Sequence, residues 1–202
     1  MRGITDVVKH LIIINVIVYI TFTLLLPQLQ QYSILFMPGG PRDAFAPVQL
    51  VTHMFMHDPN GLMHILFNMM GLFFLGPHIE RVLGEQKFLL YYLICGFAAS
   101  GLHILLYYLG FIGAVPIVGA SGAIMGVAIA FAILYPNTQL MLLFPPIPVK
   151  AKYLVGAYIL LDLFSGVGGA NTGIAHFAHL GGAIGGFILM NLWGYFDWRR
   201  FK

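Results

Sequence analysis

The sequence predicts an all-α polytopic membrane protein, built as a six-transmembrane-helix bundle with a long outward first loop. Of its 202 residues, 59% are hydrophobic and 8% are charged, whereas an ordinary soluble domain has roughly 25% charged residues. In addition, apolar stretches near the ~20 residues needed to cross a bilayer recur along the chain. Because a water-soluble fold cannot bury this much apolar surface, we expect a single membrane domain over residues 1–202.

The predicted spans should all be helical, because every backbone polar group in lipid needs a partner within the protein. They cover residues 8–26, 62–78, 87–109, 118–135, 151–168 and 174–194. Prolines and glycines concentrate between the first two spans, so residues 27–61 are predicted to form a long loop. Within this loop, residues 48–56 are apolar enough to lie along the membrane interface. The other connections are short.

The distribution of Lys and Arg predicts the orientation, because cytoplasmic loops carry an excess of these residues. With six spans, both termini lie on one side of the membrane. The basic residues on that side are Arg2, Lys9, Arg81, Lys87, Lys150, Lys152, Arg199, Arg200 and Lys202, and the other side has Arg42. We therefore expect an integral protein of the plasma (inner) membrane with cytoplasmic termini and an outward first loop.

The composition excludes several classes of function. A single cysteine, Cys95, allows neither a disulfide framework within the chain nor a cysteine metal cage. The formal charge of +3 is too small and too scattered to indicate nucleic-acid binding. His53 and His57 are four residues apart, a spacing that suits zinc on a helix. Met54 replaces the Glu of a His-Glu-x-x-His motif, so we expect no metal and no cofactor, and loop contacts for both histidines.

Three polar motifs lie in predicted membrane helices, where polar side chains are costly and often functional. His64 and Asn68 share one face of the second helix. Residues 119–122, Gly-Ala-Ser-Gly, begin the fourth helix, and residues 176–182, His-Phe-Ala-His-Leu-Gly-Gly, lie near the start of the sixth. These alternate helices run in the same direction, so all three motifs should lie at one depth near the outer surface.

The motifs together can support nucleophilic catalysis. A serine hydroxyl needs a base to remove its proton, and neutral histidine suits this task near pH 7. Ser121 and His179 can form such a pair. The negative charge that develops on a carbonyl oxygen needs preorganised donors. The Ser121 backbone N–H, at a helix N-terminus, and the side chains of His64 and Asn68 can supply them.

The acidic residues suggest no obvious third member of a catalytic triad. They are Asp6, Asp43, Asp58, Glu80, Glu85, Asp162 and Asp197. Only Asp162 lies plainly within a predicted membrane helix, near the outer end of the fifth, where an orienting role stays open. Glu80 and Arg81, at the inner end of the second helix, are expected to form surface or loop ion pairs. A Ser-His dyad is therefore the simpler hypothesis.

The three motifs, in this order on alternate helices, resemble those of the rhomboid family of intramembrane serine proteases over roughly residues 52–186. The resemblance implies a rhomboid-like bundle in which Ser121 is the nucleophile and His179 the general base and acid. It also implies that His64 and Asn68 stabilise the oxyanion. The expected activity is cleavage of membrane-anchored proteins within or beside a transmembrane segment, without metal or nucleotide.

Further residues are interpreted with the help of this resemblance. The residues expected to line the active-site cavity are Gly119, Gly122, His176, Phe67 and Met125. A structural role for His176 and close helix packing for the two glycines remain alternatives. Gly182 and Gly186 should let the sixth helix pack closely on the fourth. Many relatives carry Trp-Arg where this chain has Val48-Gln49, and an aromatic residue in place of Met125.

Two other functions are open at this point. A catalytically silent rhomboid-like protein would bind membrane clients, although such relatives usually lack the serine or the histidine that this chain keeps. A small channel or transporter would use intramembrane histidines as a polar pathway. It would need polar residues through both leaflets, whereas the inner halves of these helices are nearly all apolar. The expected partners are transmembrane protein substrates and membrane lipid, and no nucleic acid.

Overall fold

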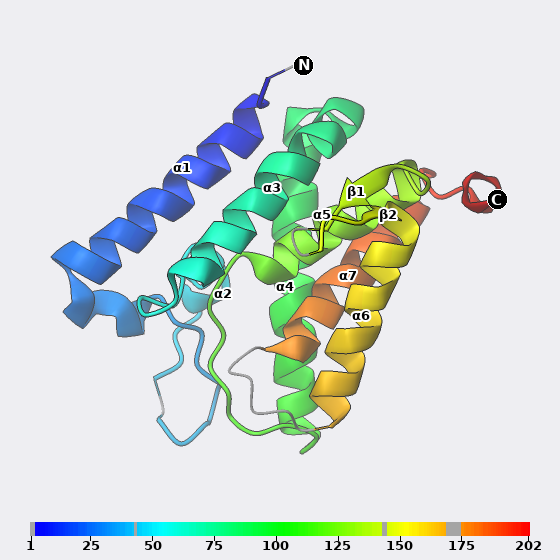
Figure 1. The fold of residues 1–202 in the computed structure, drawn as a ribbon. Helices are drawn as coiled ribbons and strands as arrows, with labels where there is room; N and C mark the ends of the chain where they lie inside the picture. The colour runs from blue at the N-terminus through cyan, green and yellow to red at the C-terminus, as the bar shows by residue number, and fades with distance from the viewer. Residues whose placement is uncertain (1–2, 43, 143–144, 169–174) are drawn as a thin grey trace.

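The computed structural model describes residues 3–42, 44–142, 145–168 and 175–202 (Figure 1). Arg2 and residue 174, the predicted first residue of the last helix, lie outside these ranges. The described chain is mostly helical. Its long helices are α1 (Asp6–Ile20), α3 (Leu62–Leu83), α4 (Glu85–Tyr108), α5 (Ser121–Leu134), α6 (Ala151–Val167) and α7 (His176–Leu192). Its shorter ones are η1 (Thr21–Leu25), η2 (Pro27–Tyr32), α2 (Gln49–Thr52) and η3 (Trp198–Phe201).

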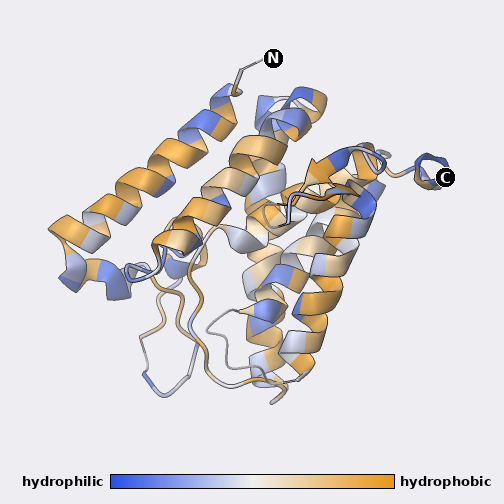
Figure 2. Ribbon diagram, viewed as in Figure 1, coloured by the Kyte–Doolittle hydropathy of each residue, from blue (hydrophilic) through white to orange (hydrophobic). Residues whose placement is uncertain are grey.

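Three helical segments in the described part of the chain are long and apolar enough to cross a membrane. They are Asp6–Leu25, Leu62–Leu83 and Glu85–Tyr108, and α5 is a shorter apolar helix. Apolar residues make up most of α1 and much of α6 (Figure 2), and many of their large side chains are exposed. Examples exposed on α6 are Leu161 and Phe164. Such a surface is suited to lipid and unsuited to water.

The predicted all-α class is correct for the helical body but misses a small hairpin between α5 and α6. Strands β1 (Gln139–Met141) and β2 (Pro148–Lys150) pair antiparallel, with Gln139 opposite Lys150. Several helix boundaries differ from the prediction, and glycines explain two of the differences. α3 continues through Pro77 to Leu83, where Gly84 with φ +80° ends it. α5 begins at Ser121 and not at 118, because Gly119 has φ +110°, outside the helical region.

Helices α4, α5 and α7 form the centre of the molecule, with α1 and α3 side by side on one flank and α6 on the other (Figure 1). Glycines allow α5 and α7 to touch backbone to backbone. A Cβ added to Gly182 would lie 1.9 Å from the Gly122 carbonyl oxygen, and one on Gly186 would lie 2.8 Å from the Gly126 Cα. Both lengths are shorter than real Cβ contacts, so only glycine fits. This contact fixes the N-terminal ends of α5 and α7 beside one another.

Candidate active site

Ser121 is the first residue of α5, and the backbone before it is shaped by Gly119. The positive φ of Gly119 disfavours residues with a side chain. A side chain at this position would also lack space, since a Cβ added to Gly119 would lie 2.8 Å from His64 Nε2. The Gly119 N–H donates to the His53 carbonyl oxygen at 2.9 Å. The segment before α5 is thus held between the loop and the His64 ring of α3.

The predicted pair of Ser121 and His179 is brought into hydrogen-bond contact. The distance from His179 Nε2 to Ser121 Oγ is 2.8 Å. His179 lies in the first turn of α7 and is only 7% exposed. The ring is stacked at a tilt of 33° near Tyr158 of α6, with centroids 6.3 Å apart. A buried imidazole at this distance can accept the hydroxyl proton.

The sequence predicts a Ser-His dyad, and the structure adds a carboxylate that contacts the histidine. Asp162 of α6 is 5% exposed. Its Oδ2 lies 3.0 Å from His179 Nδ1, and its Oδ1 lies 2.6 Å from His176 Nδ1. An ionised carboxylate only accepts hydrogen bonds, so each Nδ1 carries a proton. Ser121, His179 and Asp162 therefore form a continuous hydrogen-bonded chain across α5, α7 and α6.

The two predicted oxyanion residues lie on α3 beside this chain. The His64 ring packs edge to face against His57, with centroids 5.1 Å apart and planes at 64°. Asn68 is 6% exposed and donates from Nδ2 to the His64 carbonyl oxygen at 2.8 Å. A carboxamide carries two N–H groups, so a second donor remains on the Asn68 nitrogen. Both side chains line cavities that also contain Ser121 and His179.

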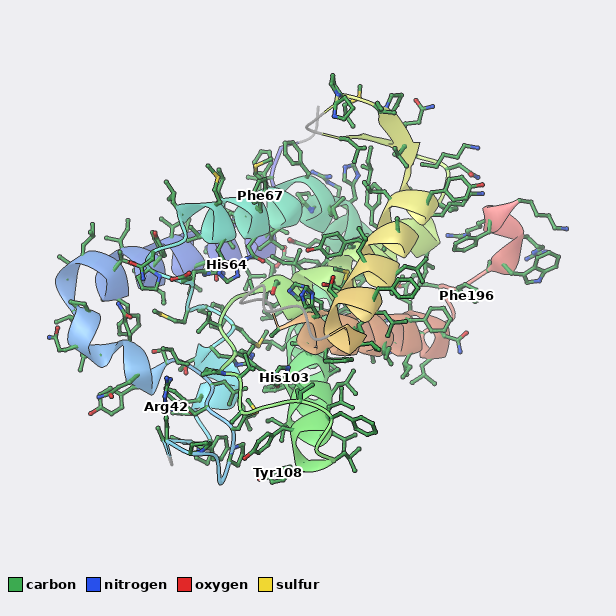
Figure 3. The ribbon with its side chains drawn as sticks, turned by 60° about the horizontal axis from the view of Figure 1, so that its bottom comes forward. Arg42, His64, Phe67, His103, Tyr108 and Phe196 are labelled. Atoms are coloured by element: carbon green, nitrogen blue, oxygen red, sulfur yellow. The ribbon has the colours of Figure 1, made fainter. Side chains whose placement is uncertain are left out.

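Two cavities meet at Ser121 and His179. The first, of about 470 Å³, lies beneath residues of the first loop, and its lining includes Arg42, His53, His57, Asp58, His64, Gly119 and Gly122. The second, of about 480 Å³, lies between α3, α5 and α6, and its lining includes Phe67, Asn68, Met125, Val155 and Tyr158. His64 and Phe67 come from the same helix (Figure 3).

The five residues predicted to line the active-site cavity are distributed as follows. Gly119 and Gly122 line the first cavity, and Phe67 and Met125 line the second. His176, for which the sequence also allowed a structural role, does not line either of these two cavities. Its ring turns toward α6 instead, where the buried Asp162 carboxylate provides a strong acceptor at 2.6 Å.

One side chain of the first loop, Gln49, is buried and bonds to the loop backbone. Gln49 is 2% exposed, whereas its neighbour Val48 is 59% exposed. Its Oε1 accepts from the N–H groups of Phe36 and Ala46 at 3.3 and 3.2 Å, and its Nε2 donates to the Ala44 carbonyl oxygen at 2.8 Å. Gln49 thus organises the loop through backbone contacts.

The two loop histidines contact backbone, as the sequence predicted. His53 Nδ1 lies 2.7 Å from the Gln49 carbonyl oxygen, and His57 Nδ1 lies 3.4 Å from that of Phe55. Burial lowers the pKa of each to about 4, so both are neutral at pH 7. Across residues 3–42, 44–142, 145–168 and 175–202, no three His, Cys, Asp or Glu side chains are grouped to hold a metal.

The sequence left an orienting role for Asp162 open but did not predict its contact with both His176 and His179. A signal for it was present: His176 and His179 are three residues apart, so both face one side of α7. A lone intramembrane carboxylate near the same depth is the natural acceptor for two such donors. The edge-to-face contact of His57 with His64 had no comparable signal in the sequence, because it depends on the path of the loop.

The comparisons with known proteins agree with this geometry. The apolar helices and the buried site define an integral membrane protein. A model of the rhomboid domain family matches residues 45–196, and the chain belongs to the rhomboid family. It is 33% identical over 150 residues to putative rhomboid protease YdcA of Bacillus subtilis, covering 70% of this chain and 64% of that one.

Two further relatives extend the comparison. Identity to rhomboid protease AarA of Providencia stuartii is 30% over 164 residues, which cover 71% of this chain and 53% of the relative. Identity to the human mitochondrial presenilin-associated rhomboid-like protein is 28% over 186 residues, which cover 89% and 46%. The matched region thus spans less than two thirds of the length of these relatives.

Proposed function

We propose that this chain is an intramembrane serine endopeptidase that cleaves transmembrane-anchored proteins within or beside their membrane segment. The observation that carries the proposal is the 2.8 Å hydrogen bond between His179 Nε2 and Ser121 Oγ, placed where two cavities meet. The names of the bacterial relatives, rhomboid proteases, support the same class of reaction.

In the proposed reaction, His179 Nε2 takes the proton from Ser121 Oγ while Oγ attacks the scissile carbonyl carbon. A bond forms between Oγ and carbon, and negative charge moves to the carbonyl oxygen. His179 then gives its proton to the leaving amine as the carbon–nitrogen bond breaks. A water molecule then gives a proton to the same histidine and attacks the acyl carbon. The histidine returns that proton to Oγ as the bond between Oγ and carbon breaks.

The oxyanion would be stabilised from two helices. The Ser121 N–H lies at the N-terminus of α5, where backbone donors have no partner within the helix. His64 and the second N–H of Asn68 approach from α3. Removing one such donor from an oxyanion site lowers kcat by roughly 10²–10³. We expect losses of this order for Asn68→Ala and His64→Ala, with a smaller change in KM.

The membrane setting is part of the proposal. The chain forms one rhomboid-like domain of six transmembrane helices, α1 with η1 and then α3 to α7, in a plasma membrane with both termini cytoplasmic. Its first loop faces outward. Water reaches Ser121 through the cavity beneath this loop, which polar side chains such as Arg42 and Asp58 line. A substrate segment enters from lipid through the cavity between α3 and α6, where Phe67 is 55% exposed.

The first experiment is labelling of detergent-solubilised protein with a fluorophosphonate serine probe. Wild type should be labelled, and Ser121→Ala and His179→Ala should not. Ser100→Ala is the matched control, because Ser100 is buried in α4 and bonds to the Gly96 carbonyl oxygen of its own helix. Cleavage of a model transmembrane substrate should follow the same pattern.

A catalytically silent protein that binds membrane clients is the alternative. It would leave folded wild type unlabelled and unable to cut any model substrate in a Ser121-dependent way. Capture of a transmembrane client without cleavage would then replace the protease assignment.

A further inference from the structure

We infer that Asp162 is a positioning residue that holds His179 in the tautomer and orientation needed for proton transfer with Ser121. The inference rests on the proposed function and deepens it. It starts from three buried side chains on two adjacent helices, with α6 and α7 side by side (Figure 1). Asp162 divides its two oxygens between two histidines, Oδ1 facing His176 and Oδ2 facing His179.

The shared carboxylate determines which ring nitrogen of His179 carries the proton. Asp162 Oδ2 accepts from Nδ1, so the proton of the neutral ring resides on Nδ1. The unprotonated Nε2 then faces Ser121 Oγ at 2.8 Å. Without the carboxylate, the ring would be free to place its proton on Nε2, and it could not accept the serine proton.

The carboxylate also stabilises the charge that forms on His179 during the reaction. Among the described residues, the titratable groups nearest His179 are Asp162 and Tyr158 of α6, His176 of its own helix and His64 of α3. Arg42, His53, His57 and Asp58 of the first loop line the same cavity as His179. Where α4 packs against α7 at Gly181, it presents the apolar residues Ala98 and Ala99. Asp162 is the acid in hydrogen-bond contact with the His179 ring. In a site of low dielectric its attraction for an imidazolium is stronger than it would be in water.

His176 makes this arrangement testable by substitution. In Asp162→Asn, the amide offers one acceptor oxygen and one donor nitrogen to two histidines. If His176 keeps its donor on Oδ1, then His179 Nδ1 must accept from Nδ2, and its proton moves to Nε2. We expect cleavage to fall by about 10²–10⁴-fold, the range for a general base in the wrong tautomer.

A second variant separates positioning from simple structural support. In Asp162→Asn/His176→Phe, the amide oxygen is free to accept from His179 Nδ1, which restores the correct tautomer. The double variant should therefore cleave faster than Asp162→Asn alone. If Asp162 only supported the packing of α6 on α7, a second substitution in the same contact would lower activity further, and this result would overturn the inference.

The pH profile of cleavage is the next readout. Loss of the carboxylate removes stabilisation of the imidazolium, so the acid limb of the profile should move to lower pH in Asp162→Asn. An unchanged rate together with an unchanged acid limb, in a variant that unfolds at the wild-type temperature, would overturn the inference.

Histidine ¹⁵N NMR in detergent tests the positioning without any activity. His179 should be protonated at Nδ1 in wild type and at Nε2 in Asp162→Asn, with Ser121→Ala as a background that retains the wild-type tautomer. A wild-type protein that failed to cleave would refute the proposed function alone. A His179 tautomer that did not respond to Asp162→Asn would refute the inference alone.

Discussion

The carbonyl oxygen of Gly122 occupies the place where a side chain on Gly182 would begin, 1.9 Å from a Cβ built there. The contact joins backbone to backbone, one residue beyond Ser121 on α5 and three beyond His179 on α7. Neither partner can yield as a flexible side chain would. The separation of the serine and the histidine is therefore determined by two glycines that take no part in the chemistry.

Gly182→Ala should force α5 and α7 apart. Overpacking of this kind lowers the free energy of unfolding by about 1–3 kcal/mol, and the Ser121–His179 bond should lengthen with it. Thermal unfolding in detergent and fluorophosphonate labelling are the measurements. Gly156→Ala on α6 is the control, since no atom lies within 4 Å of its added Cβ. Equal behaviour of the two variants would contradict the packing argument.

Gln49→Leu should destabilise the first loop. The variant leaves the buried N–H group of Phe36, and the partly buried N–H group of Ala46 and carbonyl group of Ala44, without their partner. Each unsatisfied buried group costs about 1–3 kcal/mol, although local relaxation reduces the sum. Limited proteolysis within residues 27–61 should speed up several-fold. Val48→Ala, which changes an exposed side chain, should leave the proteolysis rate near that of wild type.

Acid should destabilise the same loop through His53 and His57. Both have a pKa of about 4 in the folded protein against an ordinary value of 6.5. Between pH 4 and pH 6.5 the unfolded chain binds more protons than the folded protein. The stability that the neutral histidines provide is therefore fully present above pH 6.5 and is lost as the pH falls toward 4. The loss is on the order of 3 kcal/mol for each histidine.

His57→Phe is the control for this pH dependence, because phenylalanine keeps an aromatic ring against His64 but does not titrate. Unfolding temperatures of wild type and His57→Phe, measured from pH 7.5 to 4, should diverge as the pH falls, with the variant less sensitive to acid. Parallel curves would show that His57 does not contribute.

Glu80→Gln should loosen α1. Glu80 is 3% exposed, and its carboxylate accepts from Thr5 Oγ1 at 2.5 Å and from the N–H groups of Val7 and Val8 at 3.1 and 2.9 Å. It thereby caps the first turn of α1 from the end of α3. Loss of the charge should cost about 1–2 kcal/mol of stability. Thermal unfolding checks this against Glu85→Gln, an exposed residue in the first turn of α4.

The parts of the fold that local pattern determines could be predicted from sequence. Apolar length predicts a mostly helical membrane protein, and spacing on helices brought Ser121, His179, His64 and Asn68 to one region. The expected surface or loop ion pair of Glu80 was wrong, because its partners are the Thr5 hydroxyl and backbone N–H groups at the start of α1. An orienting role for Asp162 was left open, but its contact with both histidines was not predicted, because it depends on how α6 packs against α7. The short β1–β2 hairpin was not predicted either.

Helix α6 has two functions at once. Its residues Val155 and Tyr158 form one wall of the cavity proposed to admit substrate, and four residues beyond Tyr158, on the same face, Asp162 holds His179. An outward displacement of this wall larger than a hydrogen-bond length would carry the carboxylate away from the ring. The site would then be either open to a polypeptide or able to transfer a proton, but not both at once. Ser121 would become reactive only after α6 has moved back against a bound substrate segment.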